Sequence, residues 1–467
     1  MNLKVRRIFL LLITLLTAVS PLRSEELKVY YTGAEGWTQI RTFPLSEVDS
    51  IAFAGSASAP DRIDVALSDG EVRPFGLDSV KSVRVGINIP TLYIDTEPYV
   101  SEVPDKENYL TARFRYVPQD GSDTVVAVVS IKGRGSSSWF FPKKSYRLKF
   151  DKKQSIGGLN KAKSFVLISN WIDNTLMKNA VAFKIAEMVG LPYSNIPEPV
   201  RLVFNGEDRG SYLLTNKVGI NSGSVDIDEE KGVLWEIDTN YDEEFRFMSE
   251  PLDMPCMLKD PDLRELAGGD EQAVDSLWKA LKADLNEAMA AVVEERWTDA
   301  FDADQFVKYV LVNDIAHNTE LRYPKSLYLY KEEPGGKFKL GPVWDFDWGM
   351  GYTHGNGLHI VGGDGTARPF FVPIFQSSEF RWRFKRELEN FYLNHFNELM
   401  AFIDDYAARI RDSALANAEV WPQAHYIEKI EPREINTKRF DDNVKFLKQW
   451  FIDRFIYIRN NPYFGLY

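Results

Sequence analysis

The sequence predicts an α+β protein, because strand-like segments fill its first half and helical periodicity dominates its second half. Residues 88–240 combine alternating apolar segments with one helix candidate, and residues 241–467 carry apolar stripes at three- and four-residue steps. A shorter stretch of strands and turns, residues 25–87, precedes both. We therefore expect a small β module followed by a β-rich unit and a larger helical unit.

The composition is that of a folded protein and excludes several classes. The 467 residues are 44% hydrophobic and 27% charged, and the 13% of aromatic residues can fill a large core. The formal net charge of −12 argues against nucleic-acid binding. Cys256 is the only cysteine, which excludes an intrachain disulfide and a cysteine-rich zinc site. No two of the five histidines have HExxH spacing.

The first residues are typical of a secretory signal peptide. Lys4, Arg6 and Arg7 precede an apolar stretch at 8–19, and small residues follow up to Ser24. That stretch is shorter than the ~20 residues that span a bilayer, and a buried N-terminal helix is the alternative. We expect residues 1–24 to be a signal peptide and the mature chain to have no transmembrane segment. The protein would then be periplasmic, exposed at the cell surface or secreted.

Residues 25–87 contain a weak internal repeat. Residues 27–55 and 61–86 each run through strands and turns, and they end in the similar segments FPLSEVDSIAF and FGLDSVKSVRV. This predicts a duplicated β-hairpin module, in which we find no catalytic constellation.

The two larger parts differ in predicted secondary structure. In residues 88–240, Asn205-Gly206 predicts a hairpin, and a helix is expected over 174–189. In residues 241–467, helices are expected over 274–293 and 302–314, and a hairpin around 327–340 interrupts them. Two further amphipathic helices are indicated by the apolar stripes Phe380, Phe384, Leu388, Phe391 and Val444, Leu447, Phe451, Phe455, Ile458.

A glycine- and serine-rich segment, residues 131–139, has the composition of a phosphate-binding loop. Its backbone N–H groups and hydroxyls can cradle a phosphate. On the strand that follows, Lys144 cannot share a face with both Lys143 and Arg147, so an inward Lys144 could pair with a nucleotide phosphate. An ordinary Gly-Ser turn with solvated cations is the alternative.

Two weaker polar segments follow. Asp173 or Thr175 is suited to cap the helix expected at 174–189, while Lys178 on its first turn gains nothing from the helix dipole and so suggests another partner. Glu236 and Asp238 alternate onto one face of a strand, which a solvated edge strand explains equally well.

The strongest signal is a polar loop at 313–326, a hairpin, and then Trp-Asp-Phe-Asp-Trp at 344–348. This order is that of a kinase catalytic lobe, where a loop acid orients the acceptor hydroxyl and a later Asp holds Mg²⁺. Asp345 and Asp347 offer the oxygen ligands that Mg²⁺ prefers, and without a cation they would repel each other. A solvated acidic turn is the alternative, although the flanking tryptophans favour burial.

Taken together, these segments resemble the CotH kinase family, atypical protein kinases related to a spore-coat kinase. The similarity extends over about residues 89–461 and is carried by IKGRGSSSW, PKKSYRLKF, NWIDNTLMKNAVAF, VRLVFNGEDRGSYLL, LWEID, NTELRYPKSLYLYK and GPVWDFDWG. The resemblance implies an atypical protein-kinase-like two-lobe fold, with a small β-rich lobe at 88–240 and a larger helical lobe at 241–467. It also implies transfer of the ATP γ-phosphate to Ser or Thr of a protein with Mg²⁺.

The resemblance also assigns roles by position. The catalytic residues would be Glu320 and Asp345, and the metal ligands Asp345, Asp347 and Ser326. The residues at the nucleotide would be Arg134, Gly135, Ser136, Ser137, Lys144, Asn170, Asp173 and Lys178, with Asn179 beside them on the structural rim of the site.

Two positions depart from the family pattern. Glu320 stands where the family usually has Asp, and Ser326 where it often has Asn. Because a shift near 1 Å can cost ~10²-fold in rate, a catalytically impaired kinase-like binding or adhesion protein is the second hypothesis. Nucleotidyl transfer is a third. The acidic chain favours a basic protein acceptor.

Overall fold

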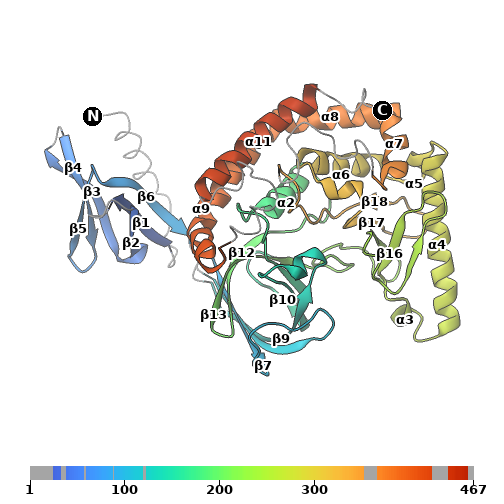
Figure 1. Cartoon of the computed structure of the whole chain (residues 1–467), viewed down its shortest axis with the longest axis horizontal. Helices are drawn as coiled ribbons and strands as arrows, with labels where there is room; N and C mark the ends of the chain where they lie inside the picture. Colours follow the sequence, from blue (N-terminus) through green and yellow to red (C-terminus); the bar gives the residue numbers. More distant parts are fainter. Residues whose placement is uncertain are drawn as a thin grey trace.

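The computed structural model describes residues 25–32, 38–56, 59–87, 89–118, 122–351, 365–422 and 440–460. The signal peptide expected at 1–24 lies outside these residues. Figure 1 shows a small β module at one end, connected to a much larger body.

The β module consists of two three-stranded sheets. Its strands are β1 (Glu25–Thr32), β2 (Thr38–Pro44), β3 (Val48–Ser56), β4 (Ala59–Leu67), β5 (Val72–Gly76) and β6 (Val80–Ile87). The sheet orders are β2-β1-β6 and β3-β4-β5, so each sheet takes two strands from one repeat and one from the other. This exchange joins the two repeats around one small apolar cluster, which contains Leu27, Val29, Phe43, Val65 and Phe75.

Seven strands of the larger body form a closed barrel. They are β7 (Thr91–Glu97), β8 (Leu110–Val117), β9 (Val125–Arg134), β10 (Ser145–Gln154), β11 (Ala162–Ile168), β12 (Glu198–Phe204) and β13 (Glu207–Asn216). The predicted hairpin between β12 and β13 is confirmed, with positive φ at Asn205 and Gly206. The barrel closes where β12 pairs with β7 in parallel.

Helix α2 (Lys178–Met188) connects β11 to β12 and is buried along most of its length. It is shorter than the predicted 174–189 segment because its first turn begins only after a polar loop. Figure 1 shows α2 between the barrel and the helical part of the body.

A second sheet follows the barrel. It has the order β15-β16-β14-β17-β18, with β14 (Val233–Ile237), β15 (Arg246–Met248), β16 (Pro255–Asp260), β17 (Leu327–Lys331) and β18 (Lys339–Leu340). Between β16 and β17 lie α3 (Leu263–Leu266), α4 (Glu271–Val293), α5 (Trp297–Ala300), α6 (Ala303–Ile315) and the 3₁₀ turn η3 (Thr319–Arg322).

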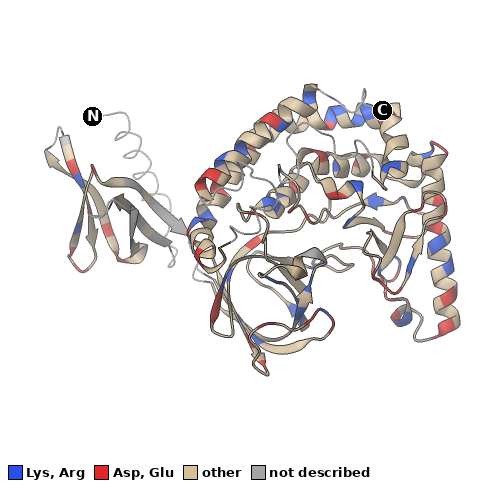
Figure 2. Cartoon of the chain, viewed as in Figure 1, with Lys and Arg blue, Asp and Glu red and all other residues tan. Residues whose placement is uncertain are grey.

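Four helices complete the described body: α7 (Arg368–Gln376), α8 (Ser378–Asn394), α9 (Phe396–Val420) and α11 (Phe440–Asn460). Both predicted stripes are confirmed, because all their apolar residues on α8 and α11 are buried in one core. Charges of both signs are interspersed over the outer faces of the helices (Figure 2). Within the described residues, no helix is long and apolar enough to cross a membrane.

The predicted two-lobe, protein-kinase-like fold is wrong. The segment expected to be a small lobe closes into a barrel, and the segment expected to be a helical lobe contributes most of a five-stranded sheet. That sheet begins at Val233, before the boundary expected at residue 240. Strand alternation indicated the individual strands, but the β7–β12 pairing that closes the barrel joins segments more than a hundred residues apart.

Candidate functional site

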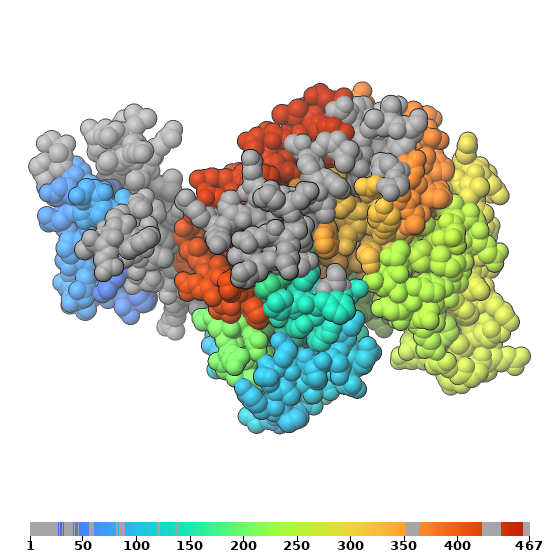
Figure 3. Space-filling view, in the orientation of Figure 1, coloured from blue at the N-terminus to red at the C-terminus, as the bar shows by residue number. Residues whose placement is uncertain are grey.

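A cleft of about 830 Å³ lies between the outer surface of the barrel and the five-stranded sheet. Figure 3 shows the surface hollowed between the barrel and the neighbouring part that carries α3 and α4. On the barrel side, alternate residues of β9 and β10 face the cleft, while their neighbours Ile131, Tyr146 and Leu148 fill the barrel core. The opposite side is formed by β14, by the loop before β17 and by the turn at 344–348.

The glycine-serine loop lies at the cleft as the sequence suggested. Arg134, Gly135 and Ser136 line it, and Ser137 begins the 3₁₀ turn η2 (Ser137–Phe140). Gly135 has φ +96°, and a Cβ there would lie 1.9 Å from the hydroxyl of Ser138, so a side chain at this point would be strained and would displace that hydroxyl. The Arg134 guanidinium lies 5.6 Å from the ring centroid of Trp344, across the cleft.

Lys144 is not brought into the cleft. Its Nζ donates to the carbonyl of Trp139 at 2.5 Å and lies 5.0 Å from that ring. The strand alternation instead turns Arg147 to the cleft, opposite Lys132 on β9. Lys143 has the same parity as Arg147 but is buried, and its Nζ donates to Asn417 Oδ1 at 2.8 Å, so parity alone does not identify the residue that faces the cleft.

Asn170, Asp173 and Lys178 do not line the cleft either. Asp173 is buried and accepts hydrogen bonds from the backbone N–H of Thr175 and of Lys178, at 2.9 and 2.8 Å. It therefore holds the start of α2, which is the capping role that the sequence left open. Lys178 is also buried and faces the turn that contains Asp347.

The residues predicted to act in catalysis and metal binding lie together in the cleft. Glu320, Ser326, Asp345 and Asp347 all line the cleft, although they come from separate segments. Burial, together with the charges of Asp345 and Asp347, raises the pKa of Glu320 to about 9. Burial and the Asp345 charge raise the pKa of Asp347 to about 7, and burial raises the pKa of Asp345 as well. Such mutual repulsion favours a cation among these groups.

The sequence left open the role of Glu236, which lies on β14, and of Asp238, which directly follows that strand. This strand is central in its sheet, so the solvated edge-strand alternative is wrong for Glu236 and Asp238, which are only 7% and 4% exposed. Glu236 forms an ion pair with Lys259 at 2.9 Å. Burial raises the pKa of Asp238 to about 6, and one of its oxygens accepts the backbone N–H of Ser326 at 3.0 Å.

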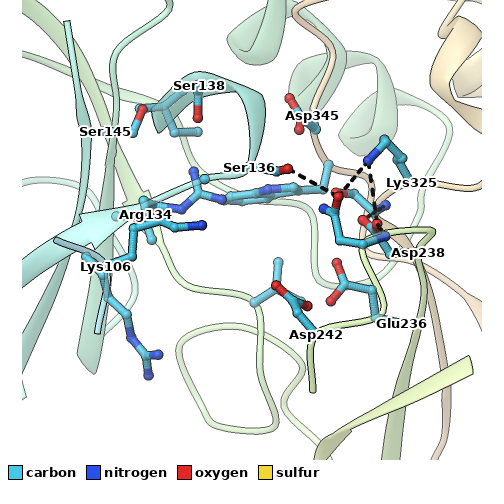
Figure 4. Close-up of a pocket in the computed structure, with 18 of the residues that line it drawn as sticks. Lys106, Arg134, Ser136, Ser138, Ser145, Glu236, Asp238, Asp242, Lys325 and Asp345 are labelled. Carbon is cyan, nitrogen blue, oxygen red and sulfur yellow. Dashed lines mark hydrogen bonds and ion pairs between the residues drawn. The ribbon is translucent and has the colours of Figure 1, made fainter. Parts of the chain in front are cut away.

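Lys325 was not predicted as a site residue. Its Nζ donates to Asn240 Oδ1 at 2.8 Å and lies 3.8 Å from Asp238 Oδ1. The Ser136 hydroxyl donates to the same Asn240 oxygen at 3.1 Å from the barrel side. Figure 4 shows Ser136 and Lys325 approaching from opposite sides of the cleft, with Asp345 nearby. Two donors thus converge on one oxygen beside the acid cluster.

The donor set suits Mg²⁺ bound together with a phosphorylated ligand. In the described part of the chain, no three His, Cys, Asp or Glu side chains form a ready-made metal cage. Mg²⁺ is commonly held by one or two carboxylates plus substrate phosphates, so a complete cage is not required. The buried Oε2 of Glu320 has no hydrogen-bond partner in the described structure, which leaves an oxygen available for a ligand.

The cleft brings carboxylates together with cationic and hydroxyl donors, a combination that is chemically suited to a phosphorylated ligand and a divalent cation. Residues 131–458 match the family model described as CotH kinase protein. The chain therefore belongs to the CotH kinase family. No curated protein matches the chain.

Proposed function

We propose that this chain is an exported protein kinase that transfers the γ-phosphoryl group of ATP to Ser or Thr of a protein, with Mg²⁺. The observation that supports this most is the convergence of Glu320, Asp345 and Asp347 with Arg134 and Lys325 in one cleft. Family membership supports a kinase-like activity in general. The proposed export rests on the signal-peptide pattern at residues 1–24.

The chemistry of each cleft residue suggests its role in the proposed reaction. Asp345 and Asp347 would hold Mg²⁺, which neutralises charge on the phosphates when it is bound. Arg134, Ser136 and Lys325 would donate to phosphate oxygens, and Glu320 would accept the proton of the acceptor hydroxyl. With a pKa near 9, the Glu320 carboxyl keeps its proton at neutral pH. A bound cation would lower this pKa, and the carboxylate could then accept the proton.

Two other functions have specific support. The departures at Glu320 and Ser326, and a β module that lies outside the family match, favour a kinase-like binding or adhesion protein with an impaired site. The same cleft would also suit nucleotidyl transfer, because that reaction uses the same metal and phosphate contacts.

One experiment separates the three functions. The mature chain is incubated with Mg-ATP and a basic protein rich in Ser and Thr, and modified residues are identified by mass spectrometry. Added phosphate supports the kinase, and added nucleotide supports nucleotidyl transfer. If neither appears while Mg-ATP still raises the thermal midpoint, the binding protein is supported. Ligand at 100 times its Kd stabilises by about 2.7 kcal/mol, which such a measurement detects.

A further inference from the structure

The turn that carries the candidate metal ligands has no regular secondary structure of its own. Residues 341–347 form neither helix nor strand, and Asp345 and Met350 have φ of 60° and 53°. Residues other than glycine rarely adopt this conformation, so surrounding contacts must fix it. The carbonyl of Ala316 accepts the backbone N–H of Met350 at 2.8 Å, and the side chains of the first turn of α2 contact the residues before Met350.

Asn179 contacts the turn through both ends of its amide. Its Nδ2 donates to Asp347 Oδ1 at 2.5 Å, and its Oδ1 accepts the backbone N–H of Phe346 at 2.9 Å. The side chain is only 1% exposed, and Nδ2 also lies 3.3 Å from Asn170 Oδ1. One side chain therefore fixes both the backbone before Asp347 and one oxygen of its carboxylate.

Lys178 holds the same turn from the adjacent position. Its Nζ donates to the carbonyl of Gly349 at 2.9 Å and to that of Asp347 at 3.3 Å. The ammonium is buried, which is costly unless it has such acceptors. Asp173 fixes the base of this arrangement, because its Oδ2 accepts the backbone N–H of Lys178 at 2.8 Å.

We propose that Lys178 and Asn179 are positioning residues that fix the Asp347 carboxylate for a divalent cation. This inference rests on the metal-binding role that the proposed function gives to Asp347, and it moves Lys178 from the nucleotide to the support of the metal ligand. Residues that hydrogen-bond to metal ligands commonly contribute 10- to 100-fold to metal affinity. Asn179 meets that description by bonding a candidate ligand oxygen directly.

The test measures metal affinity without turnover. Mn²⁺ is titrated into the full mature chain and followed by electron paramagnetic resonance, for the wild type and for Asn179→Ala. Asn195→Ala is the matched control, because Asn195 is another buried amide, donating to Thr215 Oγ1 at 3.0 Å and to the Asn216 carbonyl at 2.8 Å, outside the cleft. We expect Asn179→Ala to weaken Mn²⁺ binding about tenfold or more, and Asn195→Ala to leave it within twofold.

A double-mutant cycle tests whether Asn179 acts through Asp347. In an Asp347→Asn background, Asn179→Ala should cause little further loss of Mn²⁺ affinity, because the group that it positions is already altered. For Lys178, the Met variant should weaken Mn²⁺ binding, and the Arg variant, which keeps the charge and donors, should restore part of it. Full additivity in the cycle would contradict the inference.

The outcomes also separate this inference from the proposed function. A wild type that binds Mn²⁺ but transfers no phosphate would overturn the kinase and leave the positioning role supported, provided that Asn179→Ala weakens binding. Equal Mn²⁺ affinity in the wild type, Asn179→Ala and Asn195→Ala would overturn the positioning role even in an active kinase. A folded wild type that binds no Mn²⁺ would overturn it as well.

Discussion

The two sides of the cleft are built in different ways. On the barrel side, backbone pairing sets the positions of the charged groups, with Arg147 opposite Lys132 and Arg134 opposite Ser145 in the β9–β10 ladder. On the opposite side, Asp345 and Asp347 occupy an irregular turn that the side chains of α2 hold in place. Backbone pairing therefore positions the cations of the barrel side, whereas side-chain contacts position Asp345 and Asp347.

This difference predicts how each side responds to substitution. Removing a cation from a barrel strand deletes one charge and leaves the ladder intact. Removing an acid, or a side chain that holds it, also changes the balance of repulsion among groups whose pKa values are already raised. Effects on the acidic side should therefore be larger and should depend more on pH and metal.

The largest effect is expected for Asp345→Ala. Loss of this carboxylate removes a proposed Mg²⁺ ligand, and metal stabilisation of transition-state charge contributes several kcal/mol. Phosphoryl transfer should fall about a thousandfold, as measured by the rate of phosphate incorporation into the acceptor. Asp242→Ala is the control, since Asp242 lines the same cleft but is exposed at its margin. Comparable losses in both variants would contradict the assignment.

An intermediate effect is expected where the two sides meet, at Lys325. Its ammonium approaches Asp238 and shares an acceptor with Ser136, so Lys325→Ala should remove a phosphate contact and slow transfer about 10- to 100-fold. Lys144→Ala is the comparison, and we expect less than a threefold change because Lys144 bonds to Trp139 outside the cleft. If Lys144→Ala proved the more damaging variant, the assignment from the structure would be reversed.

The same difference explains what the sequence could and could not predict. The amphipathic stripes of α8 and α11 and the Asn205-Gly206 hairpin depend on local periodicity and turn chemistry, and these elements are present. The grouping of Asp345 with Glu320 was predicted from motif order. Closure of the barrel depends on the parallel β7–β12 pair, for which no local pattern exists, so the overall fold was predicted wrongly.

Two further reasons explain why the sequence did not indicate which residues line the cleft. Lys144 was selected by residue type and parity, but the first residue of β10 is Ser145, and only the structure shows that Arg147 faces the cleft. Glu236 and Asp238 were ambiguous because a central and an edge strand have the same alternation. Their apolar neighbours Leu234, Trp235 and Ile237, all buried, were the available signal of a central strand.

An effect on stability, and not on transfer, is expected from pH in the absence of metal. The pKa values of Asp238, Asp347 and Glu320 are raised to about 6, 7 and 9, above their values in the unfolded chain. The stability that these groups contribute is fully present below about pH 4 and is lost as the pH rises through their pKa values in the folded state. Each proton lost changes the free energy of unfolding by about 1.4 kcal/mol per pH unit. Urea unfolding with a chelator should therefore show falling stability from pH 6 to pH 9.

Two changes should flatten this slope. Glu320→Gln removes the group with the highest pKa, and Mg²⁺ offsets the repulsion among the remaining carboxylates. The free energy of unfolding of Glu320→Gln at pH 9 should then exceed that of the wild type without metal. A slope that neither Glu320→Gln nor Mg²⁺ changes would locate the titrating groups elsewhere in the chain.

The smallest effect, of opposite sign, is expected on the barrel side at Lys217. Burial, followed by the charge of Arg147, lowers its pKa to about 8, so the folded state disfavours the charged form at pH 7. Because the unfolded chain binds more protons between pH 8 and 10.5, this group makes stability rise with pH there. One pKa unit corresponds to about 1.4 kcal/mol, and the hydrogen bond from Lys217 to the Val218 carbonyl offsets part of the cost. Lys217→Met should therefore be more stable than the wild type at pH 7 and gain little at pH 10.5, as measured by urea unfolding. A gain of the same size at both pH values would mean that packing, and not the charge, explains it.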